Sequence, residues 1–283
     1  MPLANAVPVP VAHHRETRPL EDTSTERSDP YIVPALQKAL RVLELFSADR
    51  RTLSTADFAT HLGVSASSIY RIVHTLTEMG YLTKTGRNTY ELGPQVVSRG
   101  FSFLAGREIL HIAVPHLNRL RDDTSMSSHM AVRDGTEAIY IYRALAPQRI
   151  SVNVPVGSRF PCHTIAMGRM LLTALADDDL AILYKGVRID GYPSPAPQTL
   201  LELKERIAAD RRAGWALDYS DYSTAIAAPI RDYVGQVVAA INVSGPDTVM
   251  YTDGVQDSLR AALLSTADAI SRDLGWSGGT PRP

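Results

Sequence analysis

The chain has 283 residues and a formal net charge of −1, and 45% of its residues are hydrophobic. This length fits one large or two small domains with real cores. No run approaches the roughly 18 apolar residues of a membrane-spanning helix, so we expect no membrane partner. The single cysteine, Cys162, excludes an intramolecular disulfide framework and a cysteine-based zinc site. We expect no cofactor and a cytoplasmic location.

Charge is distributed unevenly along the chain. Residues 31–95 hold 7 lysines and arginines against 5 acidic residues, whereas residues 107–275 hold 17 against 20. This asymmetry is smaller than the basic stripe usual for nucleic-acid binding, but it fits a basic reader joined to a neutral or acidic regulatory body. The first 30 residues are broken by prolines and then charged, without the apolar core of a signal peptide. They predict a disordered tail at 1–30, and we expect a second tail at 276–283.

The segment after residue 53 predicts a helix-turn-helix. Ser54 with Asp57 three residues later is typical of a helix start, and Gly63 follows where a left-handed residue would end that helix. Ser65 then caps a second helix. Its apolar stripe, spaced for one helical face, consists of Ile69, Ile72, Val73 and Leu76. Two helices joined by a short turn that contains glycine are the helix-turn-helix pattern.

A helix precedes this motif and a hairpin follows it. The stretch "PALQKALRVLELFSA" (34–48) places apolar side chains on one helical face, namely Leu36, Ala39, Leu40, Leu43 and Phe46. The stretch "YLTKTGRNTYEL" (81–92) predicts two short strands around residues 85–88. Together these elements predict a winged helix-turn-helix over residues 31–93. The mostly helical residues 94–112 predict a linker helix, with Gly106 as a possible break.

The second helix of the motif has a polar face without a carboxylate. Hydroxyls, a guanidinium and an imidazole suit base edges and phosphates in the major groove, where an acidic side chain would be repelled. The helix N-terminus can also bind a phosphate. We therefore expect contact with double-stranded DNA, with the hairpin on the backbone or minor groove; the alternative is an ordinary solvated face. The expected DNA-binding residues are Ser54, Ser65, Ser67, Ser68, Tyr70, Arg71, His74, Thr75, Lys84 and Arg87.

Residues 113–275 predict an α+β domain with an antiparallel sheet. Asp134-Gly135 between alternating apolar residues predicts a hairpin, and a second hairpin turns at 233–235. The alternation in "RISVNVPVG" (149–157) predicts a further strand. Helices are expected within 164–175, 199–215 and 258–275, the second of them closed by Gly214.

The sequence carries no catalytic motif. Cys162 and His163 are adjacent, and neighbouring side chains rarely face each other, so we expect no Cys–His couple. There is no P-loop or GxSxG motif, and apart from His13-His14 the histidines do not follow metal-ligand spacings. We expect neither an enzyme nor a metal site, with Cys162 as a small buried side chain. A redox sensor that uses Cys162 remains an alternative.

Six segments together resemble the IclR family of transcriptional regulators. They are "ALQKALRVLELF", "LSTADFATHLGVSASSIYRIVHTLTEMGYL", "DGTEAIYI", "VGSRFPCHTIAMGRMLLTAL", "AGWALD" and "IAAPIRDYVGQVVAAINVSGP". The resemblance implies a dimer or a dimer of dimers that binds a palindromic operator. It also implies an N-terminal winged helix, a linker helix and a C-terminal GAF-like domain, here 113–275, that binds a small-molecule effector. A ligand-free, nucleoid-type DNA binder would lack that second domain.

Within the family, "RFPCHTIAMGRMLL" is similar to the branch that responds to protocatechuate, 4-hydroxybenzoate and related aromatic catabolites. The more general family pattern has Gly-Lys where this chain has Gly168-Arg169. The resemblance therefore implies control of catabolic genes by an aromatic acid or a close derivative. A small 2-oxo acid is the alternative effector.

The resemblance also implies effector contacts from the family's pocket, at Ala166, Met167, Asp218, Ala225, Asn242 and Ser244. The segment 218–225 is shorter than usual and lacks the frequent cysteine, so Tyr219, Tyr222 and Ser223 could supply ring surface and hydroxyls instead.

An aromatic carboxylate needs an apolar slot and a hydrogen-bond donor, for which arginine is best suited. The candidate donors are His129, Arg143, Arg149 and His163. Each has an ordinary alternative: His163 as a cap of the helix beginning at Thr164, and the arginines as solvated or dimer-facing side chains. Met167 has a plain core role as its alternative.

Overall fold

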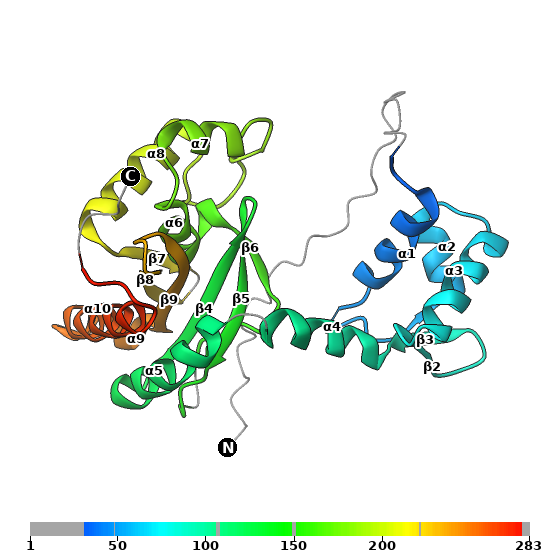
Figure 1. The fold of residues 1–283 in the computed structure, drawn as a ribbon, viewed down its shortest axis with the longest axis horizontal. Helices are drawn as coiled ribbons and strands as arrows, with labels where there is room; N and C mark the ends of the chain where they lie inside the picture. Colours follow the sequence, from blue (N-terminus) through cyan, green and yellow to red (C-terminus); the bar gives the residue numbers. More distant parts are fainter. Residues whose placement is uncertain (1–30, 48, 106–107, 149–150, 221, 279–283) are drawn as a thin grey trace, which may run out of the picture. The chain divides into compact units, whose positions relative to one another are not determined.

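The computed structural model describes residues 31–47, 49–105, 108–148, 151–220 and 222–278 (Figure 1). Its described residues form two compact units, an N-terminal unit of residues 31–105 and a C-terminal unit of residues 108–278. The division falls inside the range 94–112 predicted for a linker helix. The predicted tail at 1–30, Arg149 and residues 279–283 lie outside the described residues. None of the described helices is long and apolar enough to cross a membrane.

The N-terminal unit is a winged helix-turn-helix, which confirms the predicted fold. A three-stranded sheet in the order β1-β3-β2 packs beside the helices of its described residues. The elements are α1 (Pro34–Glu44), β1 (Leu53–Ser54), α2 (Thr55–Leu62), α3 (Ala66–Glu78), β2 (Leu82–Lys84), β3 (Thr89–Leu92) and α4 (Pro94–Ala105). Strand β1, which pairs with β3, was not predicted from the sequence.

The predicted helix boundaries follow from the expected caps. The Ser54 hydroxyl accepts the Asp57 N–H at 3.2 Å, and the Asp57 carboxylate accepts the Ser54 N–H at 2.8 Å. Gly63 ends α2 with a φ of 60°, in the left-handed region that glycine adopts without strain. The Ser65 hydroxyl then accepts the Ser68 N–H at 3.4 Å and begins α3. These local contacts fix the turn between the two helices.

The apolar face predicted for α1 is divided in the structure. Ala39, Leu43 and Phe46 pack against the core that contains Phe58, Ile69 and Val73. Leu36 and Leu40 are instead 58% and 53% exposed, on a different side of α1 from the residues that pack on the core. They line a groove of about 1060 Å³ between α1 and α3. Part of the helix face that periodicity identifies therefore remains uncovered in the single chain.

The C-terminal unit is an antiparallel sheet between two helical layers. Its described residues form six strands in the order β6-β5-β4-β9-β8-β7. Helices α5 and α10 cover one face, whereas α6 covers the other and is backed by α8 (Figure 1). The elements are α5 (Glu108–Thr124), β4 (Ser127–Asp134), β5 (Glu137–Ala144), β6 (Arg159–Pro161), the 3₁₀ turn η1 (Cys162–Thr164), α6 (Ala166–Leu172), α7 (Asp177–Leu183), α8 (Leu200–Ala213), β7 (Ala216–Ser220), β8 (Ser223–Arg231), β9 (Val237–Pro246), α9 (Asp247–Met250) and α10 (Val255–Asp273).

The predicted hairpins at Asp134-Gly135 and at 233–235 are confirmed, as are the helices now labelled α6, α8 and α10. The strand predicted over 149–157 is wrong. Its described residues have no regular structure before a turn at Val156 and Gly157, where the glycine has a φ of 92°. Pro155 supplies no backbone N–H to a strand ladder. The edge strand forms after this turn, at β6, and Tyr140 receives its backbone partners from Gly157 and Ser158.

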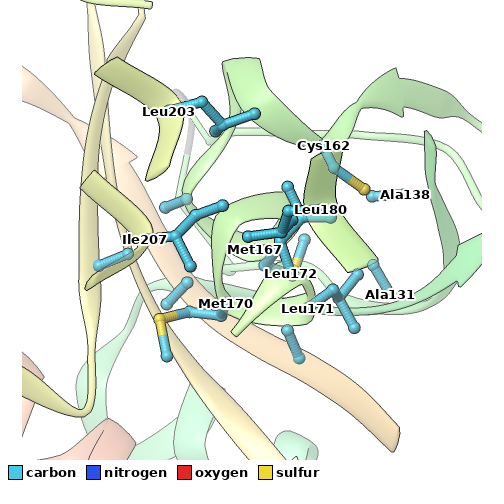
Figure 2. Close-up of a cluster of buried hydrophobic side chains, with 14 of the residues drawn as sticks. Ala131, Ala138, Cys162, Met167, Met170, Leu171, Leu172, Leu180, Leu203 and Ile207 are labelled. Carbon is cyan, nitrogen blue, oxygen red and sulfur yellow. The ribbon is translucent and has the colours of Figure 1, made fainter. Parts of the chain in front are cut away.

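The core of the C-terminal unit lies between α6, α8 and the sheet (Figure 2). Met167 and Met170 of α6 are fully buried, and small sheet residues such as Ala131 and Ala138 let the helix approach closely. Gly168 marks the tightest point. A Cβ added there would lie 2.4 Å from both Cα and the carbonyl oxygen of Cys162. Only glycine therefore fits between α6 and η1 at this position.

We predict that Gly168→Ala lowers the free energy of unfolding by about 1–3 kcal/mol, because the new methyl group overlaps backbone that cannot rotate away. Gly100→Ala is the matched control, since Gly100 also lies in a helix and its added Cβ meets nothing within 4 Å. That change should raise stability by about 0.5–1 kcal/mol. Urea unfolding of both variants measures the difference, and equal effects would contradict the close packing of α6.

Candidate functional site

The polar face of α3 is accessible along its length. Tyr70, Arg71 and His74 are exposed, and the rings of Tyr70 and His74 stack one helical turn apart, with centroids 6.3 Å apart and planes within 3°. The Ser65 and Ser67 hydroxyls lie 3.1 Å apart at the start of the helix. A ring pair, a guanidinium and hydroxyls on one exposed face can contact base edges and phosphates.

The remaining DNA candidates differ in how their groups are used. Ser68, Arg71 and Thr75 border the groove beside α1, and the Thr75 hydroxyl donates to the Arg71 carbonyl oxygen at 2.9 Å. The Ser54 hydroxyl donates to the Asp57 carboxylate at 2.7 Å, so it serves the helix cap. Lys84 ends β2 and Arg87 lies in the β2–β3 turn, where both are exposed.

The sheet of the C-terminal unit brings most effector candidates onto one face. His129 of β4 lies directly opposite Asn242 of β9 and Arg143 of β5. Ala225 of β8 lies opposite both Ser244 and Asp218. Residues that face each other across strands share a side of the sheet, and here it is the side that α6 covers. The five strands thus place these candidates in two neighbouring rows across the sheet. One row holds Arg143, His129 and Asn242, and the other holds Ser244, Ala225 and Asp218.

Two buried polar atoms in these rows lack partners. His129 Nε2 and Ser244 Oγ are buried without a hydrogen-bond partner among the residues that the structure describes. Buried polar groups in folded proteins are normally paired. The two atoms lie on adjacent strands, both on the face that α6 covers, so their hydrogen-bonding capacity is not used within the described residues.

The imidazole of His129 is held neutral by its surroundings. Burial lowers the pKa of His129 to about 4, and the charge of Arg143 acts in the same direction. Asn242 Oδ1 opposes this shift, since it accepts the His129 backbone N–H at 3.1 Å and lies 3.0 Å from Nδ1. The Tyr140 ring meets the imidazole edge-on, with centroids 5.6 Å apart. Tyr140 was not among the sequence candidates, because only the register of β4 and β5 brings it there.

Asp218 stands at the other end of these rows. Burial raises the pKa of the Asp218 carboxyl to about 6, although Arg169 and the backbone N–H groups of Tyr219 and Ala166 act against the shift. Arg169 is buried, with Nε 2.8 Å from the Asp210 carboxylate and a second nitrogen donating to the Leu217 carbonyl oxygen at 2.6 Å. It joins α6, α8 and β7 beside Asp218. In the sequence, this arginine was noted only because Gly168-Arg169 stands where the general family pattern has Gly-Lys.

A cavity of about 390 Å³ adjoins Asp218. It is lined by Thr164 and Ile165, by the loop 192–196 and by residues 218–220. Asp218 and Tyr219 are the only two of the sequence candidates on this wall. Tyr192 and the rest of its loop were not predicted, because they lie between α7 and α8 without a periodic pattern.

The other effector candidates occupy separate positions. Ala166 and Met167 are buried in the core at the start of α6. The plain core role considered for Met167 is therefore present in the structure. Arg143 is half-buried and donates to the Asn153 side chain. Tyr222 is 80% exposed in the β7–β8 turn. It therefore lies away from the sheet face that α6 covers, where the two rows of candidates lie.

The interpretation of His163 as a helix cap is wrong. The cap position of α6 is Ile165, and no side chain caps it. His163 is buried instead, with its ring centroid 4.9 Å from that of Tyr192 and 6.0 Å from that of Tyr184. Burial lowers the pKa of His163, although a backbone hydrogen bond with Ile189 acts against this shift.

Cys162 has the properties of a packed core residue. Its side chain is fully buried, and burial raises the pKa of the Cys162 thiol to about 12. Reactive thiols are exposed and have lowered pKa values, so the structure opposes the redox-sensor interpretation. Among the described residues, no group of three or more His, Cys, Asp or Glu side chains is arranged to hold a metal ion.

Comparison with known proteins gives a consistent result over the whole described chain. The family "Bacterial transcriptional regulator IclR C-terminal" matches residues 101–272, and the "IclR helix-turn-helix domain" matches residues 35–86. The Pca regulon regulatory protein of Pseudomonas putida is 31% identical over 87% of this chain and 84% of its own length. The acetate operon repressor of Salmonella typhimurium is 24% identical over 94% of this chain and 98% of its own length.

A solved structure shares the fold. The IclR homologue of Microbacterium hydrocarbonoxydans, crystallised in complex with 4-hydroxybenzoate, aligns with a TM-score of 0.71 and 23% identity, over 85% of this chain and 98% of that one. The matching families and relatives are transcriptional regulators and not enzymes. With both units matched and a relative above 30% identity across most of the chain, this protein belongs to the IclR family of transcriptional regulators.

Proposed function

We propose that this regulator acts in the cytoplasm on catabolic genes and responds to an aromatic acid or a close derivative that binds the C-terminal unit. The observation that carries the effector site is the pair of buried, unpartnered atoms, His129 Nε2 and Ser244 Oγ, on the sheet face beneath α6. A ligand that supplies their missing hydrogen bonds gains affinity from groups that folding leaves unsatisfied.

The surroundings of these atoms fit a ring-shaped acid. The rings of Tyr140 and Phe160 lie edge-on to one another near His129, and Met167 supplies further apolar surface in the same core. Arg143, directly opposite His129, is the cation placed to meet a carboxylate. The named functions of two similar proteins, the Pca regulon regulator and the 4-hydroxybenzoate-bound homologue, support an aromatic acid over a 2-oxo acid.

The DNA-binding side of the proposal rests on α3. Its exposed face carries no carboxylate from Ser65 to Thr75 and enters the major groove there, with Arg71 on base edges and the helix start on a phosphate. Lys84 and Arg87 then contact the backbone or minor groove. A chain with one recognition helix reads one half-site, so a palindromic operator requires a homodimer or a dimer of dimers.

The proposed coupling between the two activities is a population shift. The effector binds one arrangement of the assembled protein better than another, and it can change operator affinity only by that difference in affinity. The linker region between the units then changes the spacing of the two recognition helices, to which a palindrome is sensitive.

We predict that Arg71→Ala weakens binding to the preferred operator by roughly 1–3 kcal/mol and relaxes sequence preference, because a bidentate base contact is lost. Lys84→Ala should instead weaken binding to all sequences equally. It should also reduce the slope of log affinity against log salt concentration by about one, the value expected for one lost phosphate contact. The measurement is a gel-shift titration at several salt concentrations on DNA selected from a random pool by the unmodified protein. Unchanged affinity and preference in Arg71→Ala would remove Arg71 from the interface.

We predict that aromatic acids raise the melting temperature of the full chain, whereas 2-oxo acids do not. Ligand present at about 100 times its dissociation constant stabilises the folded state by about 2.7 kcal/mol. A thermal-shift screen with both ligand sets tests the assignment. A shift with 2-oxo acids alone would replace the effector class, and no shift with either set would contradict effector binding.

A further inference from the structure

We propose that His129 is a specificity-determining residue of the effector site: its Nε2 accepts a hydrogen bond, so it selects acids that also carry a hydrogen-bond donor, such as a ring hydroxyl. The inference deepens the proposed function and rests on it. It also assigns Asn242 as the positioning residue that fixes which imidazole nitrogen carries the proton.

The protonation of His129 follows from its contact with Asn242. The backbone N–H of His129 can only donate, and the Asn242 side-chain atom that receives it at 3.1 Å is therefore the carbonyl oxygen. That oxygen also lies 3.0 Å from His129 Nδ1. An amide oxygen only accepts, so Nδ1 must carry the hydrogen. In a neutral imidazole, Nε2 is then left with a lone pair.

The groups that face His129 keep the imidazole in this neutral form. Arg143 lies directly opposite on β5, and a second positive charge beside it would be repelled. On the β9 side the contact is the neutral amide of Asn242, and the ring face meets Tyr140. Asp218 is the carboxylate of the covered face. It is two strands beyond Asn242, beside Arg169, and it does not contribute to the shift of the His129 pKa.

An acceptor at Nε2 discriminates between functional groups of a ligand. A carboxylate oxygen placed there would bring two lone pairs together without a proton between them, so the acid group must bind elsewhere. Arg143, which also donates to the Asn153 side chain, is the cation on the neighbouring strand. A phenolic hydroxyl or an N–H group satisfies Nε2 directly.

The first experiment measures binding of three probes to the full chain by titration calorimetry: 4-hydroxybenzoate, 4-fluorobenzoate and benzoate. All three carry the acid and the ring, but only the first carries a donor. We expect 4-hydroxybenzoate to bind at least about ten-fold more tightly than the other two, because a site built to hydrogen-bond a hydroxyl rejects analogues that lack it. The variant His129→Phe keeps the ring and removes the acceptor, so it should bind all three within about three-fold of one another.

The second variant changes only the proton on His129. Asn242→Asp keeps an oxygen that accepts from Nδ1, but its negative charge favours the doubly protonated imidazole and turns Nε2 into a donor. We expect the preference for 4-hydroxybenzoate to weaken in this variant, because a protonated Nε2 can pair with the carboxylate that all three probes carry as well as with a hydroxyl oxygen. Because either variant could fail to fold, ¹⁵N NMR of histidine-labelled unmodified protein provides an independent test. One imidazole should show an unprotonated Nε2 whose resonance shifts on addition of 4-hydroxybenzoate and not of benzoate.

The outcomes separate the two proposals. Equal binding of the three probes by the unmodified protein, or a preference that persists in folded His129→Phe, would overturn the role of His129 while leaving an aromatic-acid effector intact. A protonated Nε2 in the unliganded protein would also overturn it. Failure of all three probes to bind would overturn both the inference and the proposed effector class.

Discussion

The close packing of α6 on the sheet is the constraint on which the rest of the C-terminal unit depends. Gly168 brings the helix against the backbone of Cys162, and alanines on the sheet leave room for the methionines of α6. Water is excluded from the face that results, so every polar group on it must find a partner within the protein or in a ligand. Most groups do, as Arg169 and Asn242 show. On the sheet face, His129 Nε2 and Ser244 Oγ are left without a partner among the described residues, and the proposed effector site rests on them.

The same reasoning explains why the two units contribute differently to regulation. The face of α3 is exposed and polar, and its contacts with DNA need no rearrangement of the N-terminal core. The proposed effector site is buried, and in the proposed mechanism a molecule that enters it changes how α6 packs on the sheet. A ligand that binds only one packing arrangement shifts the population of the whole assembly. In the proposed mechanism, regulation therefore originates in the C-terminal unit and is read out by the N-terminal one.

Features encoded by a few neighbouring residues could be predicted from the sequence. The Ser54–Asp57 cap, the left-handed Gly63 and the turn at Asp134-Gly135 each depend on short-range contacts, and each is present. The family resemblance predicted the effector domain and several candidate residues, and strand register places most of them on one sheet face. It could not show that Asn242 binds His129, 113 residues away in the chain, because strand register alone creates that contact.

The errors have physical reasons of the same kind. Alternation in residues 149–157 indicated a strand, but Pro155 and the turn at Gly157 allow pairing only afterwards. His163 looked suited to cap a helix, yet a 3₁₀ turn intervenes and buries the ring against Tyr184 and Tyr192. The face of α1 was seen correctly as apolar, but its spacing could not show that Leu36 and Leu40 remain exposed in the single chain.

The central claim is that a ligand at the buried polar row controls DNA binding by the other unit. The most direct measurement is the operator affinity of the full chain by fluorescence anisotropy, with and without saturating 4-hydroxybenzoate, for the unmodified protein and for Ser244→Ala. The account predicts a ligand-dependent change of roughly 5- to 150-fold in the dissociation constant, with Ser244→Ala needing more ligand for the same change and keeping its unliganded operator affinity. An operator affinity that saturating ligand leaves unchanged, although calorimetry shows the ligand bound, would contradict it.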